Sequence, residues 1–149
     1  MVVSFFGHRR FVERDVNAGE IIAEIEKMAE GEQVQFYLGE YGCFDAFAHR
    51  CAKKYKKLHP ETKIIFVTPY IDENYYLLQD AEERYDEIIY PKLENVPKRY
   101  AIDKRNKWIV ENSDFIFFYV IVSFGGASNA LTHARRKNIP HKNLYIKEQ

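Results

Sequence analysis

The sequence predicts an α/β protein with a mostly parallel sheet covered by helices on both faces. Short apolar runs of strand length alternate with longer stretches whose apolar residues recur every three or four positions. This alternation is typical of parallel sheets in which a helix connects each strand to the next. The 149 residues suffice for a substantial core, and no shift in composition marks a boundary, so one domain over residues 1–149 is expected.

The first strand and helix are predicted near the N-terminus. Residues 2–6 form an apolar run that stops at Gly7. Asn17 and Glu20 have the spacing of a helix capping pair, and Gly31 is placed to end that helix. The apolar residues between them follow helical spacing: Ile21, Ile22, Ile25, Met28 and Ala29.

The second unit carries the clearest helical signal in the chain. A strand over residues 34–38 ends at Gly39, and a helix then runs until shortly before Pro60. Residues 63–67 form the third strand. The apolar face of the helix is Phe44, Phe47, Ala48, Cys51, Ala52 and Tyr55.

The C-terminal half repeats the alternation less regularly. Residues 71–85 show weak helical periodicity, 87–90 have the composition of a short strand, and 91–98 indicate a loop between two prolines. A helix is predicted over 99–112 and a strongly apolar, central strand over 115–122. The last helix has Ala127, Ala130, Leu131 and Ala134 on one face and ends before Pro140, and a last strand follows over residues 143–146.

Composition excludes a disordered chain and a membrane-spanning one. Charged residues make up 30% of the chain, with 22 Lys and Arg against 22 Asp and Glu, and there are 11 Tyr and 11 Phe. The longest apolar run, residues 115–124, is too short to span a bilayer. Because the N-terminus does not have the pattern of a secretory signal, a cytoplasmic location without a membrane partner is expected.

Charge is unevenly distributed along the sequence. Residues 1–97 hold 12 Lys and Arg against 18 Asp and Glu, whereas residues 98–149 hold 10 against 4. The basic segment would suit an acidic partner or a phosphate ligand, or else the two parts of the chain, or two subunits, attract each other.

Cys43 and Cys51 are separated by a rise of about 12 Å on one helix, too far for a disulfide. The Cys and His residues lack metal-ligand spacing, so neither a metal nor a cofactor is expected.

Residues that could bind a ligand follow four of the predicted strands. In a parallel sheet these strand ends share one edge, where ligands bind near a switch in strand order. Glycines between a strand and a helix N-terminus let a phosphate approach backbone N–H groups. Such glycines also serve simple turns, and the chain contains neither G-x-G-x-x-G nor a Walker A motif. The four strand ends are Gly7-His8-Arg9, Gly39-Glu40-Tyr41-Gly42, Thr68-Pro69-Tyr70 and Ser123-Phe124-Gly125-Gly126-Ala127.

The order of these motifs resembles the SLOG superfamily near its YpsA-like branch. The resemblance rests on Gly-His-Arg after the first strand, Gly-x-x-Gly-x-Phe-Asp-x-x-Ala after the second, Arg-Asn-x-Trp with a later Ser-Asp, and a strand leading to Gly-Gly-Ala. It implies a Rossmann-like, three-layer α/β/α fold and a kinship with the LOG phosphoribohydrolases, which activate cytokinins. It also implies ligand-binding positions at Gly7, Arg9, Gly39, Gly42, Asp45, Arg105, Asn106, Gly125, Gly126 and Ala127.

The chain departs from the phosphoribohydrolases at their catalytic motif. Those enzymes carry Pro-Gly-Gly-x-Gly-Thr and then a catalytic Glu on the next helix, as the resemblance implies. Here Phe124 takes the place of the Pro, and residues 130–137 contain no acid. Glu40 and Asp45 are candidates to replace the missing acid, and whether the chain is an enzyme stays open.

Each candidate side chain has a structural alternative. Glu40 could assist departure of a base or lie solvated in a loop. Asp45 could contact a ribose, anchor its loop or complement the helix dipole. Arg9 could clamp a phosphate or lie on the surface, and His8 is expected to pack or hydrogen-bond. Arg105 lies toward the buried side of its helix and needs a partner, for which Asp114 is a candidate.

The expected function is binding of a nucleotide or nucleotide-derived small molecule at the C-terminal edge of the sheet. The alternatives are a phosphoribohydrolase-like N-glycosidase and a protein-interaction module with a vestigial pocket.

A homo-oligomer is expected, as in relatives. Nucleic acid is not expected as a partner, because no continuous basic stripe is visible, although residues 98–107 are locally basic. Aromatic residues that could stack on a base are Tyr41, Phe44, Tyr70 and Phe124.

Overall fold

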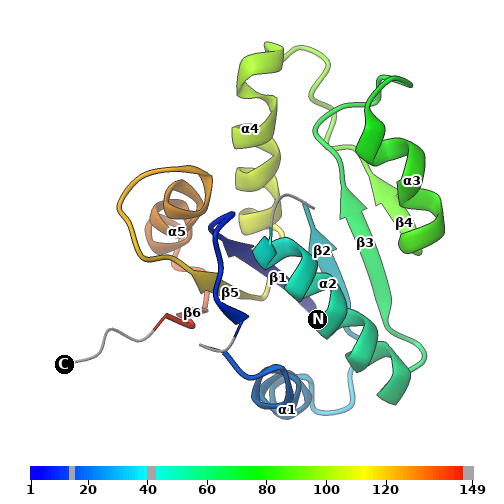
Figure 1. Ribbon diagram of the computed structural model, residues 1–149, viewed down its shortest axis with the longest axis vertical. Helices are drawn as coiled ribbons and strands as arrows, with labels where there is room; N and C mark the ends of the chain where they lie inside the picture. Colours follow the sequence, from blue (N-terminus) through cyan, green and yellow to red (C-terminus); the bar gives the residue numbers. More distant parts are fainter. Residues whose placement is uncertain (14–15, 40–42, 146–149) are drawn as a thin grey trace.

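A computed structural model of the chain describes residues 1–13, 16–39 and 43–145. Strands and helices alternate through this part of the chain (Figure 1). In order they are β1 (Val2–Gly7), α1 (Ala18–Ala29), β2 (Gln35–Leu38), α2 (Cys43–Leu58), β3 (Lys63–Val67), α3 (Tyr76–Arg84), β4 (Glu87–Ile89), α4 (Lys98–Glu111), β5 (Phe115–Tyr119), α5 (Gly126–Arg136) and β6 (His141–Asn143).

The strands form one six-stranded sheet in the order β4-β3-β2-β1-β5-β6. All five pairings are parallel, which confirms the predicted α/β class with its mostly parallel sheet. The chain adds strands outward from β1 to β4 and then returns to the other side of β1 to add β5 and β6. The strand order therefore reverses between β1 and β5, and this is where ligands bind in sheets of this kind.

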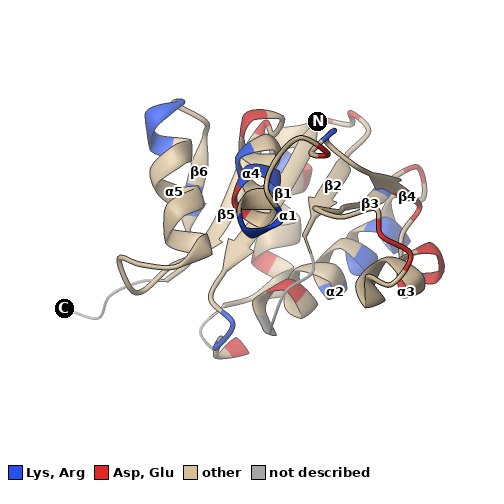
Figure 2. Cartoon of the chain, turned by 90° about the horizontal axis from the view of Figure 1, so that it is seen from above, with Lys and Arg blue, Asp and Glu red and all other residues tan. Residues whose placement is uncertain are grey.

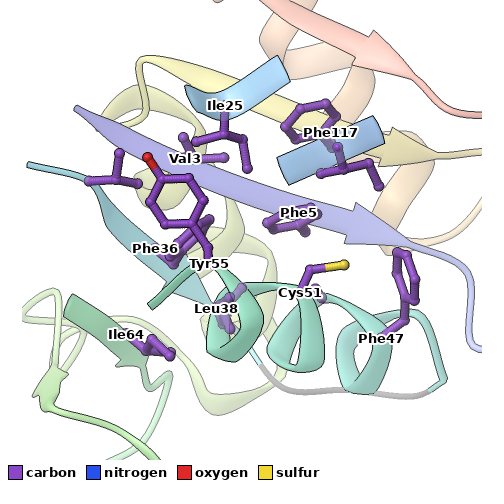
Figure 3. Packing of buried hydrophobic residues seen from close by; sticks show 14 of the residues in the cluster. Val3, Phe5, Ile25, Phe36, Leu38, Phe47, Cys51, Tyr55, Ile64 and Phe117 are labelled. Atoms are coloured by element: carbon purple, nitrogen blue, oxygen red, sulfur yellow. The ribbon is translucent and has the colours of Figure 1, made fainter. Parts of the chain in front are cut away.

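Helices cover both faces of the sheet, as the alternating pattern predicts. Val3 and Phe5 of β1 belong to a core cluster shared with α1, α2 and α3 (Figure 3). Phe6, on the opposite face of the same strand, belongs to a second cluster shared with α4 and α5. Because successive side chains of a strand point to opposite faces, one short apolar run supplies both layers of the core.

The helix ends follow from local hydrogen bonding. The Asn17 side chain accepts a hydrogen bond from the backbone N–H of Glu20 (3.2 Å), which confirms the predicted cap of α1. The helix ends at Ala29, two residues before the expected glycine, because Glu30 already takes the left-handed conformation (φ 48°) and Gly31 follows with φ 84°. None of the described helices is long and apolar enough to cross a membrane.

The last two strands differ from their predicted limits. β5 ends at Tyr119, three residues before the predicted end of the strand, and Ile121 and Val122 are partly exposed in the loop that follows. Apolar composition alone therefore overestimates the length of this strand. β6 begins at His141, two residues earlier than predicted, because it pairs with β5 from Ile116↔His141 onward.

Candidate functional site

A cavity of about 470 Å³ opens at the C-terminal edge of the sheet, near the ends of β1 and β5, where the strand order reverses. It receives residues from the ends of β1 and β2, the first turns of α2 and α5, the middle of α4, and the loop between β5 and α5. The structure thus brings together ten of the residues predicted for the ligand site: Gly7, His8, Arg9, Gly39, Asp45, Arg105, Asn106, Gly125, Gly126 and Ala127.

Of the three remaining predicted residues, the structure describes only Thr68, which does not line this cavity. Glu40 and Gly42 lie outside the described residues. Thr68 is fully buried and belongs to its own turn: its hydroxyl donates to the carbonyl oxygen of Tyr70 (2.7 Å) and accepts from the N–H of the same residue (3.3 Å). Thr68 therefore shapes the chain after β3 and does not face the site.

Arg105 of α4 forms part of the cavity wall although its side chain is buried, with 3% of the residue exposed. Its guanidinium donates to the carbonyl oxygens of Val67 (2.7 Å) and Gly39 (3.3 Å), which end β3 and β2, and to the side-chain oxygen of Asn106 (2.9 Å). Asp114 is not its partner, contrary to prediction. The Asp114 carboxylate accepts a hydrogen bond from the backbone N–H of Val2 (2.7 Å).

The charge of Arg105 is only partly compensated. Burial lowers the pKa of its guanidinium, while the negative charge of Asp45 acts in the opposite direction. An arginine stays protonated through any ordinary shift, so a positive charge persists in the wall of the cavity. Since its three described acceptors are neutral oxygens, this charge is available to attract an anion.

Two of the predicted ligand-binding glycines have packing roles. A Cβ on Gly7 would lie 2.3 Å from ring atoms of Phe44, so glycine allows α2 to pack closely on β1. A Cβ on Gly39 would lie 3.0 Å from Cζ of Arg105, so glycine makes room for the guanidinium. Both residues line the cavity, yet each is required by a protein neighbour before any ligand is considered.

The turn into α5 has the features of an anion site. Gly125 precedes the helix with φ 94° and ψ 174°, a backbone conformation that glycine adopts without strain, and a Cβ there would meet open space. No side chain caps this N-terminus and the first turn carries no acidic residue. Backbone N–H groups of Gly126 and Ala127 are therefore placed at the cavity with the positive end of the helix dipole.

His8 holds the loop that leads to this turn. Its Nε2 accepts hydrogen bonds from the backbone N–H groups of Ile121 (2.8 Å) and Val122 (3.3 Å). The ring must therefore be neutral with its proton on Nδ1. Burial lowers the pKa of His8, which favours this form. The expected hydrogen-bonding role of His8 is confirmed, and it fixes the loop between β5 and α5.

An apolar lip was missed among the predicted site residues. Phe124 is 72% exposed and lines the cavity together with Ile102 and Val122, which are each 38% exposed. The sequence signal was present, because Phe124 stands beside the glycine turn and is one of the aromatics expected to be able to stack on a base. Its exposure depends on β5 ending early, and the apolar run does not reveal that.

The fold is shared with solved structures of DNA processing protein A. One, from Helicobacter pylori, is described for a unique mode of single-stranded DNA binding; it has a TM-score of 0.63 and 17% identity over 96% of this chain and 64% of its own. Another, from Streptococcus pneumoniae, has a TM-score of 0.62 and 15% identity over 95% of this chain and 49% of its own. At this identity the likeness shows the fold. No protein-family model and no curated protein sequence matches the chain.

These neighbours contradict two predictions made from the sequence. The expected ligand, a nucleotide or nucleotide-derived small molecule, is wrong, and its alternatives gain no support, because both neighbours are DNA processing proteins. The expectation that nucleic acid is not a partner is wrong for the same reason. The resemblance to the SLOG superfamily is supported at the level of its Rossmann-like fold, whereas the YpsA-like branch and the relation to the phosphoribohydrolases are not.

Proposed function

We propose that this protein binds single-stranded DNA at the C-terminal edge of its sheet. The cavity between β1 and β5 would receive one nucleotide of the strand, and the neighbouring surface would hold the sugar-phosphate backbone on either side. The shared fold with a protein described for single-stranded DNA binding supports this proposal, although each protein's contacts must come from its own residues.

The exposure of Phe124 carries the proposal. A site for a free nucleotide buries most of its ligand, so an aromatic ring for the base would be enclosed. Phe124 instead stands 72% exposed at the lip, beside the amide groups of the α5 turn. An exposed ring next to an anion site fits a polymer, whose bases stack on aromatic side chains while its phosphates track positive charge.

Charge around the cavity supports the same reading. Arg105 places a buried positive charge in the wall, and Arg9 lines the cavity from the loop after β1 with an exposed side chain. Arg10 is also exposed in that loop. Arginines at the rim bind phosphate with charge-assisted hydrogen bonds and carry no base preference, so the expected binding is tolerant of sequence.

The stacking surface can be tested with a fluorescently labelled oligo-dT strand. Phe124→Ala should weaken binding by about 5- to 150-fold, the range that corresponds to the loss of one base stack of about 1–3 kcal/mol. Tyr76→Ala is the matched control, since Tyr76 is 63% exposed and does not line the cavity. Anisotropy titrations at low salt measure both. If the parent protein fails to bind the strand, or if Phe124→Ala binds as the parent does, the proposal is overturned.

Three further expectations stay predictions. They are the homo-oligomer, which light scattering at micromolar concentration would test, the cytoplasmic location, and the finer placement near the YpsA-like branch. Hydrolysis of an N-glycosidic bond is not proposed. Of the two candidate acids, Asp45 lies at the cavity within the electrostatic field of Arg105, and Glu40 is outside the described residues.

A further inference from the structure

Four exposed basic residues lie along one side of α2. Arg50, Lys53, Lys54 and Lys57 are all exposed and follow one another at intervals that keep them on the same side of the helix. We call these four residues the α2 ridge. It extends about 10 Å along the helix at 1.5 Å per residue. The one acidic residue of α2, Asp45, lies at the opposite end, beside the first cavity.

Most of this charge is not neutralised by the protein. Arg50 pairs with Glu13 (3.1 Å) on the loop after β1. Lys53, Lys54 and Lys57 form no ion pair with any residue that the structure describes. Blue segments follow α2 in Figure 2. Three adjacent uncompensated ammonium groups repel one another, so the ridge gains stability from any polyanion that binds it.

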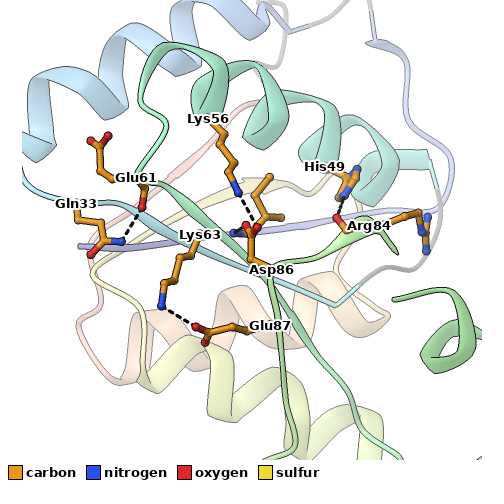
Figure 4. A network of polar contacts seen from close by, with 9 residues as sticks. Gln33, His49, Lys56, Glu61, Lys63, Arg84, Asp86 and Glu87 are labelled. Carbon is orange, nitrogen blue, oxygen red and sulfur yellow. Dashed lines mark hydrogen bonds and ion pairs between the residues drawn. The ribbon is translucent and has the colours of Figure 1, made fainter. Parts of the chain in front are cut away.

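A second cavity, of about 560 Å³, lies at the C-terminal end of the ridge. Lys53, Lys57 and Arg84 line it, together with the pair formed by Lys56 and Asp86. The Asp86 carboxylate is already engaged, since it accepts from Lys56 Nζ (2.6 Å) and from the N–H of Ile64 (2.8 Å) (Figure 4). The lining therefore keeps an excess of positive charge even with Glu83 at its border.

Helix-dipole compensation alone does not account for the ridge. Cations do favour the last turn of a helix. α5 shows that simpler case: it ends in Arg135, Arg136 and Lys137, and Lys137 is paired with Glu111 (3.5 Å). On α2, by contrast, the basic residues begin two turns before the end and continue into a cavity.

We propose that the α2 ridge and the second cavity bind the phosphate backbone of the same single DNA strand that occupies the first cavity. The proposal rests on the proposed function. α2 connects the two places directly, because its first turn lines the first cavity and its later turns line the second. Its 16 residues correspond to about 24 Å. A strand of a few nucleotides would fill only the first cavity, and a longer strand would reach both.

The test compares strand lengths and two triple variants. K53Q/K54Q/K57Q removes three ridge charges, and R135Q/R136Q/K137Q removes three charges from the end of α5. Binding of oligo-dT strands of about 6 and about 20 nucleotides is measured by anisotropy over a range of salt concentrations. For the long strand, the ridge variant should lower the slope of log K against log salt by about 2, since each phosphate contact contributes roughly 0.7. For the short strand, it should bind as the parent does.

The outcomes separate the ridge from the first cavity. The proposal holds if only the ridge variant loses affinity, and only for the long strand. Equal losses for both strands, equal losses in both triple variants, or no loss at all would overturn it. It is also overturned if the ridge variant keeps the long strand but loses binding to poly-glutamate, which would assign the ridge to an acidic protein. If the parent protein does not bind the short strand, the function proposed for the first cavity fails instead.

Discussion

The carbonyl oxygen of Gly39 accepts a hydrogen bond from the guanidinium of Arg105 (3.3 Å), and the same glycine leaves the space in which that guanidinium lies. Gly39, at the end of β2, therefore accommodates the buried guanidinium of Arg105, whether or not a ligand is bound. Arg105 joins α4 to the ends of β2 and β3 and places a positive charge in the wall of the cavity.

Gly39→Ala should destabilise the protein. Its Cβ would lie 3.0 Å from Cζ of Arg105, so either the guanidinium or the strand end must move. A cost of about 1–3 kcal/mol in the free energy of unfolding is expected for such overpacking. Gly126→Ala is the control, because its Cβ would make an ordinary 3.7 Å contact with Asn106. Urea unfolding compares the two; equal stability would show that Arg105 shifts freely.

Gly7→Ala should destabilise the protein for a different reason. The new Cβ would overlap the ring of Phe44, whose nearest atoms are 2.3 Å away. A loss of about 1–3 kcal/mol or more is expected, because Phe44 is fully buried and cannot turn away. In combination with Phe44→Ala, the substitution should cost much less than it does alone. Additive losses in this double-mutant cycle would contradict the close packing of α2 on β1.

Replacing Arg105 should cost more than losing an exposed arginine. Arg105→Met removes the donor from the carbonyl oxygens of Gly39 and Val67, and about 1–3 kcal/mol of unfolding free energy should be lost because these buried acceptors are left unsatisfied. Arg105→Lys should restore only part of the stability that Arg105→Met loses, because an ammonium group cannot reproduce the planar fork of donors of a guanidinium. Arg99→Met, on the exposed side of the same helix, is the control. Chemical denaturation that finds the same stability for the Met and Lys variants would disprove a need for the charge.

Stability should fall below about pH 6.5 because of His8. Its pKa in the folded protein is lower than in the unfolded chain, so the unfolded chain takes up the proton first as the pH falls. The stabilising contribution is complete above the unfolded pKa of 6.5 and is lost between that value and the lower folded one. Protonation also removes the acceptor for Ile121 and Val122.

His8→Gln isolates this effect, because a glutamine carbonyl can accept a hydrogen bond and does not titrate. The difference in Tm between about pH 7.5 and about pH 5.5 should be smaller in His8→Gln than in the parent. The other four histidines contribute equally to both proteins. An unchanged difference in Tm would show that the loop does not depend on the neutral ring.

Much of the fold could be predicted because the local signals agree with the tertiary structure. The alternation along β1 supplies two core layers, and the apolar face of α2 has a regular period. The limits of β5 could not be read in the same way. Its apolar run continues to Phe124, but the backbone N–H groups of Ile121 and Val122 donate to His8 Nε2 instead of pairing with the sheet, and this contact comes from a distant segment of the sequence.

The position of the site could be predicted from the topology of the sheet, whereas the contacts that its residues make could not. Strand ends of a parallel sheet meet at one edge, so Gly7, Gly39 and Gly125 could be expected there together. What each glycine accommodates depends on side chains that arrive from other elements, as Phe44 and Arg105 do. The basic residues of the α2 ridge stand close together in sequence with no acid between them, but cations are also favoured at a helix C-terminus, so the sequence alone does not mark them as a binding surface.

The pairing of β1 with β5 has a consequence for how the protein is made. Val3 lies opposite Phe115, 112 residues later in the chain, and the loops that follow these two strands line the first cavity. During synthesis β1 can pair with β2 early, but its other edge stays open until β5 has been translated, and such long-range pairing is slow. The cavity therefore forms late, and a nascent chain that ends before Gly126 lacks one wall of it. Binding at this edge would distinguish a finished molecule from an unfinished one.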